Sequence, residues 1–264
     1  MITNFHTHTN RCCHAEGSEE DYVSEAIRQG VVQMGFSDHA PFPDYDFGFR
    51  MQYNELNDYL SAIEQSQRKH KGEIQLFKGL EIEYFPHYQN YYRELFDKYR
   101  LDYLALGEHM YIDANGKRKN IFFANSTQDY IDYANAVCEA IETKLFSFVA
   151  HPDVMFTNPF NWDSSCENAS RLIIDCAEKN DVILEFNANG IRKNVRAYPE
   201  GIRCPYPHKS FWEIVQKTNI RVIIGSDNHI PSQIHDDYVR KAEQMAHRWG
   251  LNVVQSIDFH SYKY

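Results

Sequence analysis

Side chains of the types that bind metal ions follow most of the short apolar runs in this chain. Six of the seven runs end in such residues, which are His6 and His8, Asp38 and His39, Glu81, Glu108 and His109, His151 and Asp153, and Asp227 and His229. Imidazole and carboxylate groups are ligands that divalent transition metals take from proteins. Coincidence would have to repeat at run after run, so the pattern indicates a metal site built from distant parts of the chain.

Two pairs within this set have the spacing needed to bind one ion together. His6 and His8 are separated by one residue, as are Asp227 and His229, and alternate side chains of an extended segment point to the same side. A single pair is a weak signal, because strand-face polarity also produces it. The excess of imidazole over thiolate favours zinc, with iron or manganese as alternatives, over calcium or magnesium.

The apolar runs have the length and composition of buried strands and alternate with longer amphipathic stretches. We expect strands at residues 2–5, 31–36, 74–80, 103–106, 145–150, 182–186 and 220–224. We expect helices near residues 19–29, 53–70, 88–99, 127–143, 165–180, 210–218 and 236–249. Seven such units predict a parallel α/β sheet, and its length suits one barrel domain over residues 1–264. In a barrel the strand ends converge on the C-terminal face.

Composition narrows the classes of partner. Hydrophobic residues make up 43% of the chain and aromatic residues 14%, which excludes a disordered protein. The net charge of -10 argues against nucleic acid as the main partner, although bound cations would still let an anionic substrate approach. The absence of a basic leader and of a long apolar run predicts a cytoplasmic protein without a membrane partner. Nothing in the sequence indicates an oligomeric state, and the six cysteines are expected to be free thiols. Cys12 and Cys13 are expected in packing or solvent contact, with metal binding beside the first histidines as the alternative.

The chain resembles the PHP (polymerase and histidinol phosphatase) family, and within it the histidinol-phosphate phosphatases. The resemblance rests on HTHT at 6–9, SDHAPFP at 37–43, GLEIEYFP at 79–86, LDYLALGEH at 101–109, FSFVAHPD at 146–153, LEFNANGIRK at 184–193 and IGSDNH at 224–229. SDHAPFP and the segment that ends in Arg192 and Lys193 are the elements most specific to the phosphatases. The proline-rich stretch 197–210 departs from the family pattern, which puts the pocket wall in doubt but not the metals.

The resemblance implies a distorted (β/α)7 barrel, similar to a TIM barrel, with three divalent ions at the C-terminal face of the strands. One ion would take His6, His8, Glu81 and Asp227, and Glu81 would bridge to a second ion held by His109 and His151. The third ion would take His14, His39 and His229. Spacing alone supports His14 least, because it lies in a loop beside cysteines.

A phosphate ester also needs a fixed donor, and the planar fork of arginine suits that task. Arg192 follows an Asn-Gly turn at a strand end and matches the arginine of the phosphatase motif, so it is the expected phosphate-binding and catalytic cation. Arg196 and Asn187 are further candidates for substrate contact. Glu83 is interpreted as a partner that orients a ligand histidine, with binding of a substrate ammonium group as the alternative.

The expected reaction is hydrolysis of L-histidinol phosphate to L-histidinol and phosphate, a step of histidine biosynthesis. A hydroxide bridging the metals would be the nucleophile, Arg192 would offset charge, and Asp227 or a ligand histidine would pass a proton to the leaving group. A phosphodiesterase, a nuclease or a phosphatase for other small monoesters on the same scaffold remains an alternative. So does a metal-binding domain without catalysis, which would need no anion-binding arginine.

Overall fold

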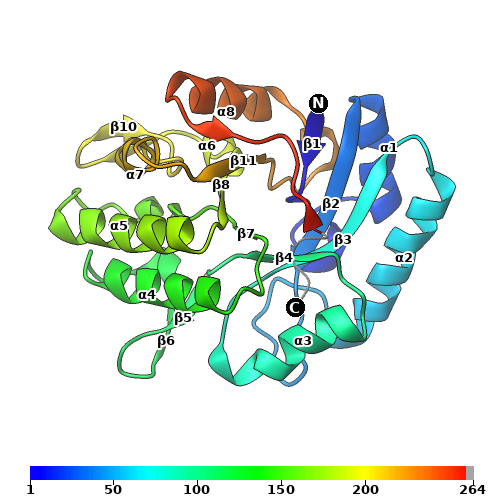
Figure 1. Cartoon of the computed structure of the whole chain (residues 1–264), viewed down its shortest axis with the longest axis horizontal. Helices are drawn as coiled ribbons and strands as arrows, with labels where there is room; N and C mark the ends of the chain where they lie inside the picture. Colours follow the sequence, from blue (N-terminus) through cyan, green and yellow to red (C-terminus); the bar gives the residue numbers. More distant parts are fainter. Residues whose placement is uncertain (260–264) are drawn as a thin grey trace.

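The computed structural model describes residues 1–259, and its centre is an eight-stranded sheet in which every neighbouring pair is parallel. In order of pairing, the strands are β1 (Ile2–Asn4), β2 (Val31–His39), β3 (Gln75–Ile82), β4 (Tyr103–Leu106), β7 (Phe148–Val149), β8 (Ile183–Asn187), β11 (Arg221–Gly225) and β12 (Asn252–Val253). The sheet curls on itself, and helices surround it on the outside (Figure 1).

In the described residues, β1 and β11 meet only beyond their C-terminal ends. Just beyond β1 and β11, Thr7 and Asn228 form a parallel bridge, and the His8 N–H donates to the Asn228 carbonyl over 3.1 Å. At the opposite end the segment after β12 lies between them, where the Thr3 hydroxyl donates to the Gln255 carbonyl over 2.8 Å. The barrel is therefore closed directly at one mouth and filled by an extra segment at the other.

The helices carry the chain from each strand back to the start of the next. They are α1 (Glu19–Arg28), α2 (Leu56–Lys69), α3 (Gln89–Asp97), α4 (Asp129–Glu142), α5 (Ser164–Lys179), α6 (Asn189–Arg192), α7 (Lys209–Val215) and α8 (Asp237–Arg248). Short 3-10 turns are η1 (Asn10–Cys12), η2 (Tyr53–Glu55), η3 (Pro86–Tyr88), η4 (Ile121–Phe123), η5 (Val154–Thr157) and η6 (Pro231–Gln233). Ser18, Asp163 and Asp236 begin α1, α5 and α8, since their side chains accept backbone N–H groups of the first turn.

Alternation along the strands separates the barrel interior from the helix-facing core. In β3, Phe77, Gly79 and Glu81 share the inner face, while Leu76 and Leu80 pack outward among the helices. The apolar inner positions form one buried cluster, which consists of Phe5, Phe77, Tyr103, Ala105, Phe148, Ala150, Ile183, Ile223, Ile257 and Phe259. This cluster fills the barrel beneath the polar side chains of the C-terminal mouth.

Tyr103 shows how tightly the interior is filled. Its hydroxyl lies 2.8 Å from the carbonyl oxygen of Phe5 and 2.9 Å from that of Phe36. A Cβ atom at Gly79 would lie 2.3 Å from the Tyr103 ring, so only glycine leaves room for this tyrosine. The ring thus ties three strands together beneath the candidate site.

The structure confirms the predicted fold class, and all seven expected strands are present. The sequence did not reveal β12, nor the hairpins β5 (Met110–Ile112) with β6 (Arg118–Asn120) and β9 (Arg196–Tyr198) with β10 (Gly201–Arg203). Strands of two or three residues are too short to show an alternation.

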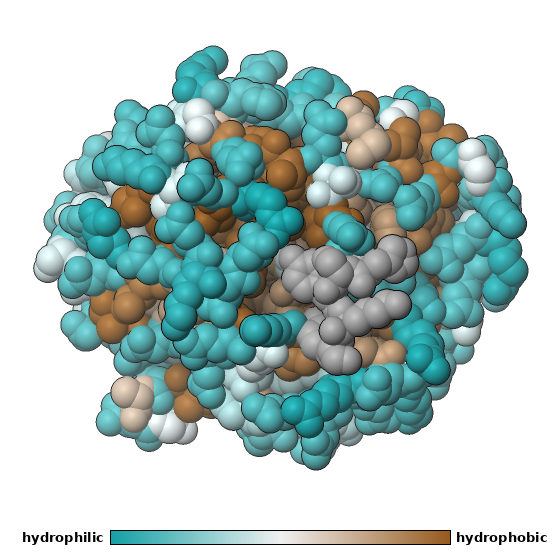
Figure 2. Space-filling model, in the orientation of Figure 1, coloured by the Kyte–Doolittle hydropathy of each residue, from teal (hydrophilic) through white to brown (hydrophobic). Residues whose placement is uncertain are grey.

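One face of the molecule is mostly polar. Figure 2 shows a mainly hydrophilic face on which apolar side chains appear in separate areas. Within residues 1–259, none of the helices has both the length and the apolar character needed to cross a membrane.

Candidate metal centre

All nine side chains predicted as ligands lie at the C-terminal mouth of the barrel or in the loops above it. His6 and His8 follow β1, His39 ends β2, Glu81 lies in β3, His109 follows β4, His151 follows β7, Asp227 and His229 follow β11, and His14 follows η1. Parallel strands bring their carboxyl ends to one edge, which is why residues more than 200 positions apart meet here. The structure thus brings the whole predicted set together.

Glu81 is the centre of this set. Its Oε1 lies 2.8 Å from His151 Nε2 and 3.6 Å from His109 Nε2. Its Oε2 lies near three more imidazole nitrogens, at 3.0 Å from His39 Nδ1, 3.4 Å from His6 Nε2 and 3.5 Å from His8 Nε2. Glu81 is 1% exposed, and Oε2 is buried without a hydrogen-bond partner. A buried oxygen with no donor is costly unless a cation satisfies it.

The separations between donor atoms match those around a common ion. Metal–nitrogen bonds of about 2.0–2.1 Å with tetrahedral angles place ligand atoms about 3.4 Å apart. His6 Nε2 and His8 Nε2 are 3.1 Å apart, and His14 Nε2 and His229 Nε2 are 3.0 Å apart. Five overlapping groups have mutual distances within 4.8 Å, and one of them combines His8 and His229 with Cys12. The four that consist only of predicted ligands are His6, His8 and Glu81; His6, His151 and Asp227; His39, Glu81 and His109; and His14, His39 and His229. The residues therefore fit a cluster of divalent ions.

Hydrogen-bond acceptors hold several of the imidazole rings in a fixed orientation. His6 Nδ1 lies 2.7 Å from Glu185 Oε1, and His109 Nδ1 lies 3.4 Å from Glu83 Oε1. His14 Nδ1 lies 2.8 Å from the Cys12 carbonyl oxygen, and His229 Nδ1 lies 3.2 Å from the Asp227 carbonyl oxygen. An acceptor at Nδ1 places the proton there and leaves the Nε2 lone pair for an ion. For Glu83 this is the orienting role that the sequence favoured.

The surroundings of the imidazoles shift their pKa values in opposite directions, upward for His6 and downward for His39 and His229. Burial opposes a charge on His6, yet Glu185, Asp227 and Glu81 together raise its pKa well above the usual value. Burial and the nearby His8 lower the pKa of His39 to about 4 and that of His229 to about 2. The group above the barrel mouth is thus held as neutral imidazoles, the protonation state that binds a metal.

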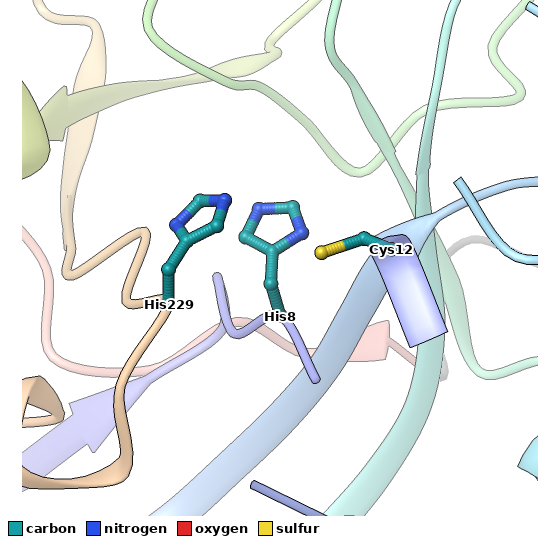
Figure 3. Close-up of side chains that lie close together, drawn as sticks. All are labelled: His8, Cys12 and His229. Atoms are coloured by element: carbon teal, nitrogen blue, oxygen red, sulfur yellow. The ribbon is translucent and has the colours of Figure 1, made fainter. Parts of the chain in front are cut away.

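Cys12 is the one thiol close to this cluster in the described residues. Figure 3 shows the His8 and His229 rings side by side, with the Cys12 sulfur pointing toward His8 from η1. Burial and the charge of Asp38 raise the pKa of Cys12 far above its usual value, and its Sγ donates to the Thr9 carbonyl over 3.2 Å. A thiol held in its protonated form is a poor ligand. Its contacts agree with the packing role expected from the sequence.

A cavity of about 590 Å³ opens above the cluster. Arg192 lines it, together with Lys193, Tyr206, Phe122 and seven of the predicted ligands. The structure does not bring Arg196 or Asn187 to this wall: Arg196 is exposed on β9, and Asn187 is buried and donates to Glu185 and Asp227. Their contact with substrate, like that of Arg192, stays a prediction.

Sequence reasoning missed residues that support the site from irregular segments. Arg50 is buried and makes two hydrogen bonds of 3.1 Å to the carboxylate of Glu83. It belongs to the loop 40–52, where no periodicity marks its position. Lys193 and Tyr206 also went unassigned, although Lys193 follows Arg192 in the quoted motif. For Glu185, which accepts from His6, the sequence does carry a signal: Glu185 and Asn187 are two polar residues on the same face of one apolar strand.

The curled parallel sheet and the cluster at its mouth define a class, the α/β barrels that carry a metal centre lined by histidine and carboxylate. Within that class, the chain belongs to the PHP domain family, whose profile matches residues 4–189. The matched region contains seven of the nine predicted ligands. Asp227 and His229 lie beyond it.

Curated relatives span most of the chain. A protein of Deinococcus radiodurans named "Probable histidinol-phosphatase" is 26% identical over 235 residues, which cover 87% of this chain and 86% of the relative. The histidinol-phosphatase of Bacillus subtilis is 23% identical over 252 residues, covering 85% and 92%. The crystal structure of a histidinol phosphate phosphatase from Lactococcus lactis, complexed with zinc, L-histidinol and phosphate, superposes with a TM-score of 0.72 at 17% identity and covers 97% of this chain and 98% of that one.

Proposed function

We propose that this chain hydrolyses L-histidinol phosphate to L-histidinol and inorganic phosphate with divalent transition-metal ions. The observation that carries the proposal is the convergence of nine metal-ligand side chains around Glu81 at the barrel mouth. The names and coverage of the curated relatives support the choice of substrate. Zinc is the expected metal, with iron or manganese as alternatives.

Three ions suit the arrangement of donor atoms. One ion would take His6, His8 and Asp227 together with Glu81, and Glu81 would also serve a second ion with His109 and His151. The third ion would take His14, His39 and His229. When bound, the ions supply a hydroxide nucleophile and neutralise charge on the phosphoryl oxygens. Asp227 is 5% exposed and lines the cavity. In this proposal Asp227 or a ligand histidine passes a proton to the leaving alkoxide.

The test combines metal analysis with turnover. Protein purified without chelator should approach three ions per chain and should release phosphate from histidinol phosphate faster than from other small monoesters or a phosphodiester. Removal of the ions by a chelator should abolish turnover, and their return should restore it. Activity on the diester alone, or full activity with a single ion, contradicts the proposal.

A further inference from the structure

Lys193 is a partly buried cation on the wall of the cavity. It follows α6, and its Nζ lies 3.1 Å from the Tyr206 hydroxyl. The ammonium also lies over two rings, 5.2 Å from the centre of Tyr206 and 5.9 Å from that of Phe122. No carboxylate of residues 1–259 is within ion-pair distance of it. Lys193 therefore has one hydroxyl and two aromatic faces as neighbours, but no anion.

The two rings that bracket Lys193 also pack on the metal ligands. Phe122 is stacked on His109, with ring centres 5.8 Å apart and planes 18° apart. Tyr206 packs against His151, with ring centres 6.2 Å apart. His109 and His151 are the two histidines that face Glu81 Oε1. The ammonium group is thus placed one ring away from this part of the cluster and opens to the same cavity.

A partly buried ammonium without a counterion is less stable than one in water, and nearby charges decide by how much. Burial lowers the pKa of Lys193, and the more distant Asp227 and Glu81 oppose that effect. Bound divalent ions would neutralise both of these carboxylates. The lysine would then be left as a cation that faces the cavity and lacks an anion.

Arg192, the neighbouring cation, has no donor to spare. A guanidinium carries five N–H groups. The five acceptors around Arg192 are Asp236 Oδ2 at 2.9 Å, Ser226 O at 3.0 Å, Ser226 Oγ at 3.3 Å, and Asn189 Oδ1 and Gln233 O at 3.4 Å each. Two of these acceptors belong to Ser226, which precedes Asp227, and a third belongs to Asn189, whose amide donates to Asp227. A fourth is the Gln233 carbonyl, in the loop that follows Asp227. Arg192 thereby holds the end of β11 in place.

We propose that Lys193, together with the Tyr206 hydroxyl, binds the phosphoryl oxygens of the substrate and that Arg192 is a positioning residue. The inference deepens the proposed function and rests on it for the identity of the ester. Lys193 supplies a point charge and Tyr206 a neutral donor, on the side of the cavity formed by His109 and His151. A phosphate dianion bound there supplies the counterion that Lys193 lacks.

The test measures binding of inorganic phosphate to metal-loaded protein by calorimetry. Lys193→Met keeps the length of the side chain and removes its charge, and Lys209→Met is the matched control on an exposed lysine beside Glu213. We expect the Kd for phosphate to rise about tenfold to hundredfold in Lys193→Met, the scale of one charged hydrogen bond. The control should match wild type. Tyr206→Phe should weaken phosphate binding by a smaller factor.

Two further readouts separate binding from structure. Metal content should stay unchanged in Lys193→Met, and its melting temperature without phosphate should equal or exceed that of wild type, because an unpaired, partly buried charge has been removed. Unchanged phosphate affinity, or weaker binding that accompanies a lower melting temperature or lost metal, overturns the inference. If wild type binds phosphate through Lys193 but does not hydrolyse histidinol phosphate, the proposed function fails while the role of Lys193 stands.

Discussion

Replacing Glu81 by glutamine tests the arrangement of the whole cluster. Both carboxylate oxygens face imidazole nitrogens, and Oε2 has no hydrogen-bond donor. Glutamine has nearly the same volume, but one of its two ends is an NH₂ group without a lone pair for an ion. Glu81→Gln should therefore lose the ability to bridge while the barrel still packs.

The size of the effect follows from the grouping of the ligands. Glu81 belongs to two of the three proposed ion sites, and the third, formed by His14, His39 and His229, does not contain it. The variant should retain one ion per chain where wild type retains three. Turnover of histidinol phosphate should fall by at least about a thousandfold, which corresponds to about 4 kcal/mol of transition-state stabilisation.

Elemental analysis and steady-state kinetics on the same samples measure both quantities. Glu108→Gln is the matched control, because Glu108 is also 1% exposed and beside the site but belongs to none of the ligand groups. Its Oε2 accepts the Tyr84 N–H over 2.8 Å, a bond that a glutamine oxygen keeps. Three ions in Glu81→Gln, or full turnover with one ion, would refute the bridging role.

The remaining predictions concern a second ligand and a titrating core histidine. Asp227→Asn should keep the circular dichroism of wild type but lose at least about a hundredfold in turnover. The reason is that Asp227 accepts hydrogen bonds from Asn187 and Asn189 on one side and faces His8 at 3.2 Å on the other. Normal turnover with a full metal complement would contradict this. Burial lowers the pKa of His208 to about 4, so the stability that it contributes is present above about pH 6.5 and is lost as the pH falls toward 4. His208→Phe keeps the stack on Trp162, whose ring centre is 4.9 Å away, and should reduce the loss of unfolding free energy between pH 7 and pH 4 by about 3 kcal/mol in urea titrations; identical losses in both proteins would contradict it.

The strands and the ligands were predictable because they share one signal. Val31–His39 and Gln75–Ile82 are long enough to show an apolar run, and each run ends in His39 or Glu81 at the barrel mouth. Parallel topology then brings these ends together whatever the loops do. His14 was the exception, since its place beside His229 depends on η1 and only the family resemblance indicated it.

The cavity wall was not predictable in the same way. Arg192 has the chemistry of a phosphate clamp, but its donors are used within the protein, which depends on where η6 and α8 begin. Arg50 reaches Glu83 from an irregular loop, and Lys193 gains its setting from Tyr206. Such contacts depend on loop conformation and not on periodicity, so local sequence patterns do not reveal them.

The bridge between Thr7 and Asn228 sets an order of events during protein synthesis. His229 is synthesised more than 200 residues after His6, and at about 5–20 residues per second the interval between them is on the order of tens of seconds. During that time His6 and His8 lack Asp227 and His229, which lie beside them in the folded chain. The predicted ligand set is therefore complete only after His229 has been synthesised.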